Sequence, residues 1–261
     1  MIDLHSHVLP GLDDGAAELG ASIAMAREAA AAGITALAAT PHVRDDYPTT
    51  AREIEDALAA VRRAVREQGI EVEILSGAEI AFDRLHSLDE DELRPFGLGG
   101  SPNHLLIELP FFGWPLDTAD QLRRLRGAGF TTVLAHPERN SAVQDSPQRL
   151  ADLVSDGALV QLTAASITGG FGSAAARSSR TLLSAGLVHL IATDTHRADG
   201  RGTALGPALD SLRDPALARW LTRDVPRAIV EGAACPPRPH SHSGWLRKTL
   251  QRGAPASKFA M

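Results

Sequence analysis

Short apolar runs that each end in a His, Asp or Glu are the feature that most constrains how this chain can fold. The runs end in the motifs IDLHSH, LAATPH, ILSGAE, LLIE, VLAHPE and LIATDTH. Acidic and imidazole groups at strand ends can share one site only if cations hold them together, because carboxylates repel each other and buried charges need partners. The pattern therefore indicates a multinuclear metallohydrolase.

The candidate metal ligands come from these runs and from the loop that follows the first of them. They are His5, His7, Asp14, His42, Glu79, Glu108, His136, Asp194 and His196. In the Asp-Asp-Gly turn we favour Asp14 over Asp13 as the ligand, because the turn can aim it back at the strand ends. For Glu108 the alternative is a salt bridge with an arginine.

The donor atoms of this set predict the kind and number of ions. Nitrogen and oxygen ligands without thiolate suit Mn, Fe, Zn or Mg in a cluster, and they do not suit a structural zinc finger. The set exceeds the needs of one ion. We therefore expect two or three divalent ions, with a carboxylate such as Glu79 bridging two of them.

Composition places the chain among ordinary globular proteins. Its 261 residues are 44% hydrophobic and 22% charged, enough for one large domain. The formal net charge of −6 gives no sign of nucleic-acid binding. The single cysteine, Cys235, excludes an internal disulfide, and no apolar run approaches the roughly 20 residues of a membrane span. A cytoplasmic location is the simplest expectation.

The last part of the chain differs from the rest. Residues 234–261 hold five basic residues and no Asp or Glu, and they are rich in Pro, Ser and Gly. Such a composition argues against packing, so we expect a disordered basic tail after a domain that spans residues 1–233.

Apolar runs and stretches with helical spacing alternate along the domain. The predicted strands are Ile2–His5, Ile34–Ala39, Glu71–Leu75, Leu105–Leu109, Thr131–Ala135, Ala158–Leu162 and Val188–Thr193. The predicted helices are Leu19–Ala32, Ala51–Gln68, Asp117–Gly127, Gln148–Asp156 and Ala174–Ala185, with a helical excursion at Asp83–Pro95 and terminal helices in Ala204–Glu231. Continuously apolar strands suit a sheet covered on both faces. The alternation predicts an α/β fold with a parallel sheet and right-handed crossovers.

The site residues favour closure of this sheet into a barrel. The first strand carries His5 and His7, and the last carries Asp194 and His196. In an open sheet these strands would usually lie too far apart to share ions. In a barrel the carboxyl ends of all strands surround one mouth, where chemistry takes place.

The motifs, in this order, resemble those of the PHP (polymerase and histidinol phosphatase) superfamily. MIDLHSHVLPGLDDGA is the most specific, and TPHVR, SGAEI, LLIELP, AHPERN and TDTHRADGR follow it. Together they are similar to the bacterial capsule-associated protein-tyrosine phosphatases of the CpsB/YwqE type. The similarity runs from Met1 to about Glu231.

The resemblance implies a distorted (β/α)7 TIM-like barrel with a trinuclear, often manganese-containing, site. It implies one ion held by His5, His7, Glu79 and Asp194, a second by Glu79, Glu108 and His136, and a third by Asp14, His42 and His196. Arg139 and Arg201 match the family's phosphate-contacting arginines. A phosphate monoester dianion favours bidentate guanidinium donors, which supports this role. The alternative is pairing of these arginines with carboxylates such as Glu138 or Asp199.

The implied activity is metal-dependent hydrolysis of phosphate monoesters, as in a protein-tyrosine phosphatase. The implied substrate is a phosphotyrosine protein, such as a tyrosine kinase of capsule or exopolysaccharide biosynthesis. Cysteine-based phosphatase chemistry is excluded, because it needs an arginine six residues after the cysteine and position 241 is Ser241. The run at residues 109–115 is either an apolar rim for a phosphotyrosine ring or a loop packed on the barrel.

Two other functions stay open. One is a small-molecule phosphatase, such as a histidinol-phosphate phosphatase, on the same metal platform. The other is a nuclease-type module, which the acidic body of the chain disfavours because a nuclease needs a basic groove. An oligomer is compatible with the sequence.

Overall fold

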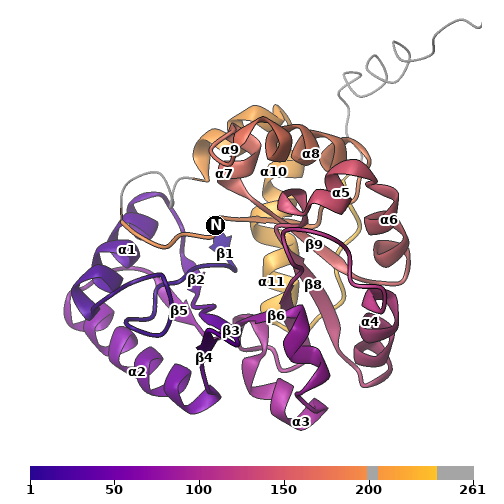
Figure 1. Cartoon of the computed structure of the whole chain (residues 1–261). Coiled ribbons are helices and arrows are strands. Elements are labelled where there is room, and N and C mark those ends of the chain that lie inside the picture. The colour runs from indigo at the N-terminus through magenta and orange to yellow at the C-terminus, as the bar shows by residue number, and fades with distance from the viewer. Residues whose placement is uncertain (199–204, 240–261) are drawn as a thin grey trace, which may run out of the picture.

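The computed structural model describes residues 1–198 and 205–239, with strands at the centre and helices around them (Figure 1). The strands are β1 (Ile2–Asp3), β2 (Ala36–Ala38), β3 (His42–Arg44), β4 (Tyr47–Pro48), β5 (Glu73–Leu75), β6 (Glu79–Ala81), β7 (His104–Glu108), β8 (Thr131–Ala135), β9 (Leu159–Thr163) and β10 (Leu190–Ala192). Each predicted strand is present, with ends that differ by a few residues. Every residue of β7 and β9 is buried, as expected for strands covered on both faces.

The strands of the described residues form two sheets. One has the order β1-β2-β5, and the other has the order β10-β9-β8-β7-β6-β3-β4. All neighbours are parallel except β3 and β4. The predicted α/β class with a parallel sheet is therefore confirmed.

Two short connections lead from the β1-β2-β5 sheet into the other sheet, one from β2 to β3 and one from β5 to β6, and each contains a residue that interrupts the strand. Pro41 lies between β2 and β3, and a proline has no N–H to donate to a ladder. Gly77 lies between β5 and β6, where a Cβ would stand 3.1 Å from Cγ2 of Thr40. The sequence-based strands ended before these breaks, so β3 and β6 were not predicted.

The ends of the first and last strands lie side by side, as the site residues require. Ser6 and Thr195 form an isolated parallel bridge, and the amide of Asp194 donates to the carbonyl of His5 at 3.0 Å. The ladders nevertheless make two sheets and not the single closed sheet of the expected barrel.

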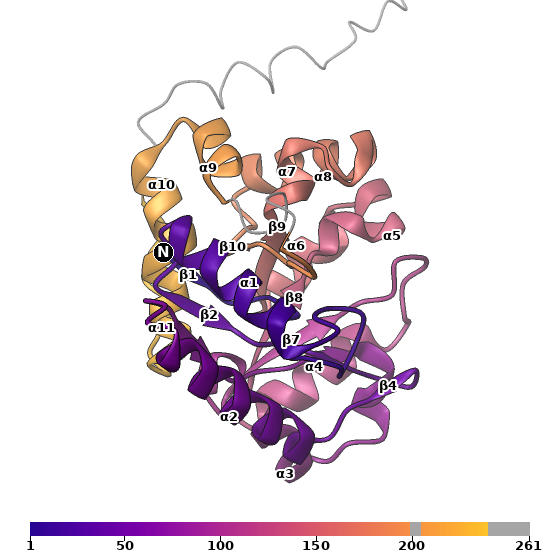
Figure 2. The same ribbon diagram turned by 90° about the vertical axis from the view of Figure 1, so that its left-hand side faces the viewer.

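Helices surround the strands and cover the outer faces of both sheets. They are α1 (Leu19–Ala31), α2 (Ala51–Glu67), α3 (Glu90–Leu93), α4 (Thr118–Gly127), α5 (Ser141–Asp145), α6 (Gln148–Ser155), α7 (Ala164–Thr168), α8 (Gly172–Ser184), α9 (Gly206–Leu212), α10 (Pro215–Arg219) and α11 (Val225–Val230). Figure 2 shows α1 in front of β1 and β2 with α2 beside it, and α2 packs against α1 and β5. A capping box of Thr50 and Glu53 begins α2, close to the predicted start. The short helices α5 and α7 were not predicted.

The described part of the expected tail lies against the body of the protein. The indole N–H of Trp220 donates to the carbonyl of Pro236 at 3.0 Å, and the Arg238 guanidinium donates to the carbonyl of Leu183 at 3.2 Å. The rest of the tail, residues 240–261, lies outside the described residues. No helix in the described ranges is both long and apolar enough to cross a membrane.

Acid should destabilise the fold in part through His189, at the start of the last strand. Burial and, to a smaller extent, the charge of Arg238 together lower the pKa of His189 to about 4. Its Nδ1 accepts a hydrogen bond from the amide of Val160 at 3.2 Å, so the folded protein favours the neutral ring. A folded-state pKa below the unfolded value means that stability is complete above about pH 6.5 and falls as the pH drops toward 4.

Replacing His189 by asparagine should reduce this loss, because the amide oxygen can accept the same hydrogen bond and does not titrate. The expected difference between wild type and His189→Asn is about 2 kcal/mol in unfolding free energy lost between pH 6.5 and 4. Urea denaturation at both pH values measures this loss of unfolding free energy. The contributions of other acid-sensitive groups cancel in the comparison, because both proteins contain those groups. Equal losses in the two proteins would contradict the role of His189.

Candidate metal centre

The register of the parallel sheet brings several of the predicted ligands together, although His42 and Glu79 are the first residues of β3 and β6 and Glu108 is the last residue of β7. His42 on β3 pairs with Glu79 on β6, and Ala81 on β6 pairs with Glu108 on β7. Glu108 in turn pairs with Ala135 of β8, which precedes His136. Parallel register thus places four candidate ligands, His42, Glu79, Glu108 and His136, on or directly after neighbouring strands.

All nine predicted ligands belong to groups whose donor atoms lie within 4.8 Å of one another. The groups are His7, Asp14, His42 and His196; His5, Glu79 and His136; His5, His7 and Asp194; and His42, Glu79 and Glu108. They share members, so they form one continuous cluster. The predicted trio of Asp14, His42 and His196 is present, with His7 beside it.

Glu79 lies at the centre of the cluster. Its Oε1 is 2.8 Å from Nε2 of His136, and its Oε2 is 3.0 Å from Nδ1 of His42 and 3.3 Å from Nε2 of His5. Its side chain is 1% exposed. A carboxylate with both oxygens among three imidazoles has the position of a bridging ligand.

The cluster strongly shifts the acidity of its members. Burial opposes the charge of Glu79, but the surrounding imidazoles of His5 and His136 outweigh it and hold the pKa of Glu79 well below its usual range. Burial likewise opposes the charge of His136, yet Glu79 raises the pKa of His136 to about 9. Burial, followed by the charge of Glu79, raises the pKa of Glu108.

Some donor atoms of the cluster lack protein partners, which is what bound cations require. Oε2 of Glu79 and Nδ1 of His42 are buried and only 3.0 Å apart, yet neither makes a well-aligned hydrogen bond to the other or to another described residue. Leaving such atoms unsatisfied costs about 1–3 kcal/mol each. The donor set of imidazoles and carboxylates, together with these unsatisfied atoms, fits divalent ions such as Mn²⁺ or Zn²⁺.

Two candidate ligands occupy a strained backbone conformation. The φ angles of His136 and Asp194 are 32° and 55°, in the left-handed region that L-residues disfavour. Each costs on the order of 1–2 kcal/mol. His136 directly follows β8, and Asp194 lies just beyond the end of β10. At both positions the left-handed turn redirects the side chain into the cluster. Strain of this kind typically marks functional sites.

Arg139, predicted to contact phosphate, lies at the edge of the cluster. Its Nη1 donates to Oδ2 of Asp194 at 3.1 Å, and the expected alternative partner, Glu138, instead accepts from the amide of Thr163 at 3.1 Å. The guanidinium lies between two aromatic rings, 4.5 Å from the ring of Phe111 and 4.2 Å from that of Phe171. Arg201, the other predicted arginine, lies outside the described residues.

Side chains behind the cluster orient its imidazoles, a role that the sequence did not predict; the sequence indicated Asp13 only as an alternative ligand to Asp14. Asp13 accepts from Nδ1 of His7 at 2.7 Å, and Oε1 of Gln161 lies 2.9 Å from Nδ1 of His5. The buried carboxylate of Asp3 accepts from the amide of His5 and from the hydroxyl and amide of Thr193. A carboxylate or amide on the far ring nitrogen commonly fixes the tautomer of a metal-binding histidine.

Replacing Asp13 by asparagine should weaken metal binding. Oδ2 of Asp13 accepts from His7 and from the amide of His42 at 3.0 Å, while Oδ1 accepts from the amide of Gly15 at 2.9 Å. An asparagine would turn an NH2 group toward one of these donors. We expect Mn²⁺ affinity to fall about 10–100-fold in calorimetric titration. Asp120→Asn, at an exposed carboxylate on α4, is the matched control; equal affinities in both variants would contradict this role.

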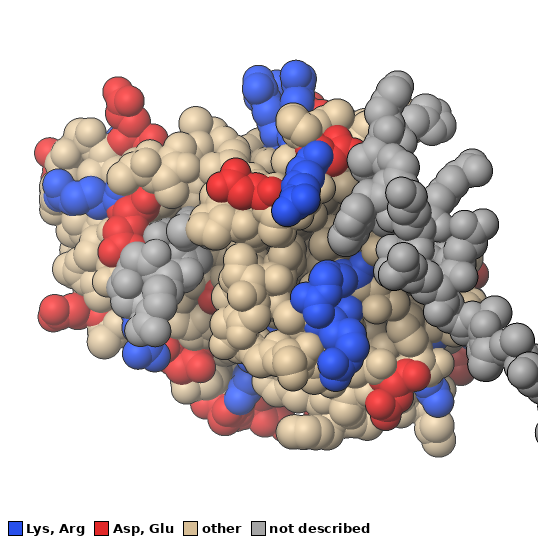
Figure 3. All heavy atoms as spheres, turned by 90° about the horizontal axis from the view of Figure 1, so that it is seen from above, with Lys and Arg blue, Asp and Glu red and all other residues tan. Residues whose placement is uncertain are grey.

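The described residues on the face seen from above form no basic groove of the kind that binds nucleic acid. On the face that Figure 3 shows, arginines and acidic side chains of the described residues are interspersed, and they do not gather into one basic band. A nuclease-type module would need such a band to follow a phosphate backbone.

Comparisons with known proteins point to one protein family. A family model described as capsular polysaccharide synthesis, CpsB/CapC, matches residues 1–219. The chain is 37% identical over 207 residues to the tyrosine-protein phosphatase YwqE of Bacillus subtilis, covering 77% of this chain and 79% of the relative. It is 27% identical over 241 residues to the tyrosine-protein phosphatase CpsB of Streptococcus pneumoniae, covering 88% of this chain and 98% of the relative.

Solved structures give the same picture. One comes from work on YwqE of Bacillus subtilis and CpsB of Streptococcus pneumoniae, described as unique metal-dependent tyrosine phosphatases. It matches with a TM-score of 0.83 and 29% identity, over 93% of this chain and 100% of that chain. A resiniferatoxin-binding protein from Rhodobacter sphaeroides matches with a TM-score of 0.55 and 18% identity, over 84% of this chain and 77% of that chain, which is a likeness of fold alone.

Proposed function

Because the chain belongs to the CpsB/CapC family of capsular polysaccharide synthesis, we propose that it is a metal-dependent protein-tyrosine phosphatase. The observation that carries this proposal is the central position of Glu79. Its two buried oxygens face imidazoles from three other segments of the chain, and one of these oxygens has no hydrogen-bond partner among the described residues. Such a cluster suits cations and the negatively charged phosphoryl group that cations attract.

We propose that two or three divalent ions, Mn²⁺ first among them and Fe, Zn or Mg as alternatives, bind this cluster. The ligands would be His5, His7, Asp14, His42, Glu79, Glu108, His136, Asp194 and His196. Bound ions would supply an acidified water molecule and positive charge for the phosphoryl oxygens. The strand ends would act as the mouth of a distorted (β/α)7 barrel, with the break at Pro41 as part of its distortion.

The chain's own residues would bind and orient the phosphate monoester. Arg139 supplies a planar guanidinium, already held flat between Phe111 and Phe171, which can donate two parallel hydrogen bonds to a phosphate. Arg201 would supply a second guanidinium. The tyrosine leaving group is relatively acidic, with a free pKa of ~10, so it needs little protonation as the P–O bond breaks.

The substrate we propose is a phosphotyrosine protein, and the family points to a tyrosine kinase of capsule or exopolysaccharide assembly. Such a kinase would meet this enzyme in the cytoplasm. The relatives named as tyrosine-protein phosphatases support this choice over a small-molecule phosphatase.

Turnover by the full chain loaded with Mn²⁺ tests the proposal. We expect a phosphotyrosine peptide to be hydrolysed with a kcat/KM at least about tenfold above that for histidinol phosphate. The release of inorganic phosphate measures both reactions under the same conditions. A preference for histidinol phosphate would show that the substrate is a small molecule and not a protein. If the chain hydrolyses neither compound, the proposed phosphatase activity is wrong.

A further inference from the structure

An open pocket of about 180 Å³ lies beside the candidate metal centre, between the ends of β6 and β7 and the loop that follows β7. We call it the β6–β7 pocket. Its lining residues are Arg44, Ala81, Phe82, Asp83, Glu108, Leu109, Pro110 and Phe111. The sequence indicated residues 109–115 of this loop as an apolar rim or a packed loop, but it gave no role to Arg44 or Ala81.

The pocket is continuous with the cluster of candidate ligands. Ala81 lies two residues beyond Glu79 on β6, so the two side chains share one face of the strand. Ala81 also pairs in register with Glu108, which groups with His42 and Glu79. A molecule in the pocket would therefore extend directly into the cluster.

Most residues that line the pocket are apolar, and its charged members are Arg44, Asp83 and Glu108. Phe82 and Leu109 are buried, and Pro110 and Phe111 continue the apolar surface. Nη1 of Arg44 lies 3.8 Å from Oε2 of Glu108, on the side of the cluster. An apolar chamber that ends at cations and carboxylates suits a ligand with one apolar and one charged end.

Phe111 connects this chamber with the phosphate-binding side of the site. Its ring lines the pocket, lies 5.8 Å from the ring of His136 in a stacked arrangement, and stands 4.5 Å from the Arg139 guanidinium. Asn140 holds the loop in place by donating to the carbonyls of Pro110 and Gly113. The chamber wall and the arginine are thus parts of one fixed arrangement.

The size of the pocket matches a single aromatic ring. An engineered protein cavity of about 150 Å³ lined by apolar side chains binds benzene. We propose that the β6–β7 pocket binds the aryl ring of the substrate, so that a phosphate on that ring reaches Arg139 and the cluster. This inference rests on the proposed phosphatase function and adds the reason why the enzyme would prefer aryl to alkyl phosphates.

A pair of phosphonates isolates the contribution of the ring. Phenylphosphonate and methylphosphonate carry the same anionic group, and only the first can fill the pocket. We expect the Mn²⁺-loaded full chain to bind phenylphosphonate at least about tenfold more tightly in calorimetric titration. Equal affinities would overturn the proposal on the wild-type protein alone, even if a variant fails to fold.

Ala81→Leu places a larger side chain in the pocket and should remove the preference. We expect the ratio of the two phosphonate affinities to fall to below about threefold, because the leucine takes the space of the ring. In turnover, kcat/KM for a phosphotyrosine peptide should fall at least about tenfold more than kcat/KM for acetyl phosphate, which has no ring.

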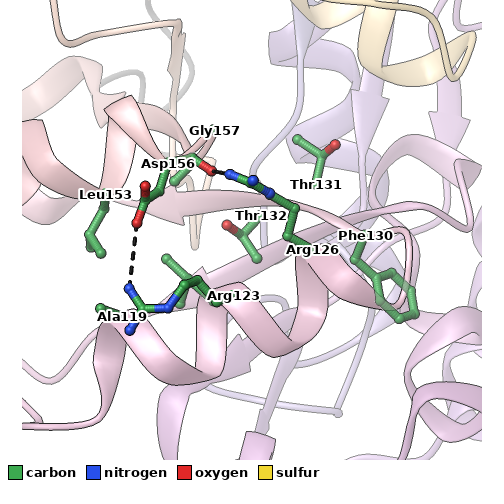
Figure 4. A pocket seen from close by; sticks show the side chains of 11 residues that line it. Ala119, Arg123, Arg126, Phe130, Thr131, Thr132, Leu153, Asp156 and Gly157 are labelled. Atoms are coloured by element: carbon green, nitrogen blue, oxygen red, sulfur yellow. Dashed lines mark hydrogen bonds and ion pairs between the residues drawn. The ribbon is translucent and has the colours of Figure 1, made fainter.

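Ala119→Leu is the matched control, because it makes the same substitution in a different cavity. That cavity, of about 80 Å³, lies at the amino ends of β8 and β9, where Arg123 faces Asp156 (Figure 4). This is the end of the strands away from the cluster. We expect the control to keep the wild-type preference for phenylphosphonate and for the phosphotyrosine peptide.

The possible outcomes distinguish a failure of the proposed aryl-binding pocket from a failure of the proposed phosphatase activity. If Ala81→Leu stays folded and metal-loaded and keeps the full preference for the ring, the pocket does not bind the aryl group, while the proposed phosphatase function stands. If the wild-type chain hydrolyses neither the phosphotyrosine peptide nor acetyl phosphate, the phosphatase function fails, and the aryl site fails with it.

Discussion

Replacing Glu79 by glutamine should lower the turnover of a phosphotyrosine peptide by at least about a thousandfold, or ~4 kcal/mol of activation free energy. Glutamine keeps the shape of the side chain but removes its charge and one of its two acceptor oxygens. Oε1 of Glu79 lies 2.8 Å from the imidazole of His136, and Oε2 lies within 3.3 Å of the imidazoles of His42 and His5. The substitution therefore weakens both groups of candidate ligands that contain Glu79, one with His5 and His136 and the other with His42 and Glu108.

Two measurements on the purified variant check this effect. Metal per chain should fall together with kcat, and the circular dichroism spectrum should stay that of the wild type. Glu73→Gln is the matched control, because Glu73 is exposed at the amino end of β5 and should tolerate the change without effect. A Glu79→Gln variant that keeps more than about a tenth of wild-type kcat would exclude a bridging role.

Replacing Arg139 by lysine should lower kcat/KM about 100-fold while metal content stays unchanged. Lysine keeps the positive charge but loses the planar fork that donates two hydrogen bonds. It also loses the flat face that lies 4.5 Å from Phe111 and 4.2 Å from Phe171. Phosphate release with a phosphotyrosine peptide, measured over a range of substrate concentrations, gives kcat and KM separately.

Arg149→Lys provides a close control for this experiment. Arg149 is exposed on α6 and its guanidinium also lies near an aromatic ring, 5.7 Å from that of Trp114. Loss of an arginine–aromatic contact is thus common to both variants, and only Arg139 lies beside Asp194. If both variants lose activity equally, or if neither does, a specific phosphate contact by Arg139 is ruled out.

The pattern of strands and ligands could be predicted because it depends on local sequence. A buried parallel strand reads as a continuous apolar run, and its carboxyl end can be placed to within a few residues. His5, Glu108 and His136 each follow such a run, and the structure brings all three to one cluster. The resemblance of the motifs to a known family added the assignment of the ligands to three ions and the two phosphate-contacting arginines.

Other features depend on contacts between distant segments and could not be read from the sequence. Asp13 and Asp14 are adjacent, and only the path of the loop turns Asp13 toward His7 and Asp14 toward His42 and His196. The strand breaks between β2 and β3 and between β5 and β6 arise where two segments pass close together, and the short strands β3 and β6 that follow them were missed.

The aromatic rings around Arg139 are a second example of contacts between residues that lie far apart in the sequence. Phe171 comes from the loop before α8, more than thirty residues after Arg139, and no local pattern links the two. The ring of Phe111 precedes the arginine along the chain and covers its other side. Such a stack requires the loops after β7, β8 and α7 to converge, which only the folded chain shows.

Titration of metal-free full-length protein with Mn²⁺ tests the central claim most directly, that strand-end carboxylates and imidazoles hold the ions on which hydrolysis depends. Bound metal per chain and phosphotyrosine turnover are measured on the same samples. We expect no turnover after chelation, and activity that rises as two to three ions bind. Full turnover by the chelated protein, or a chain that binds no Mn²⁺ at all, would contradict it.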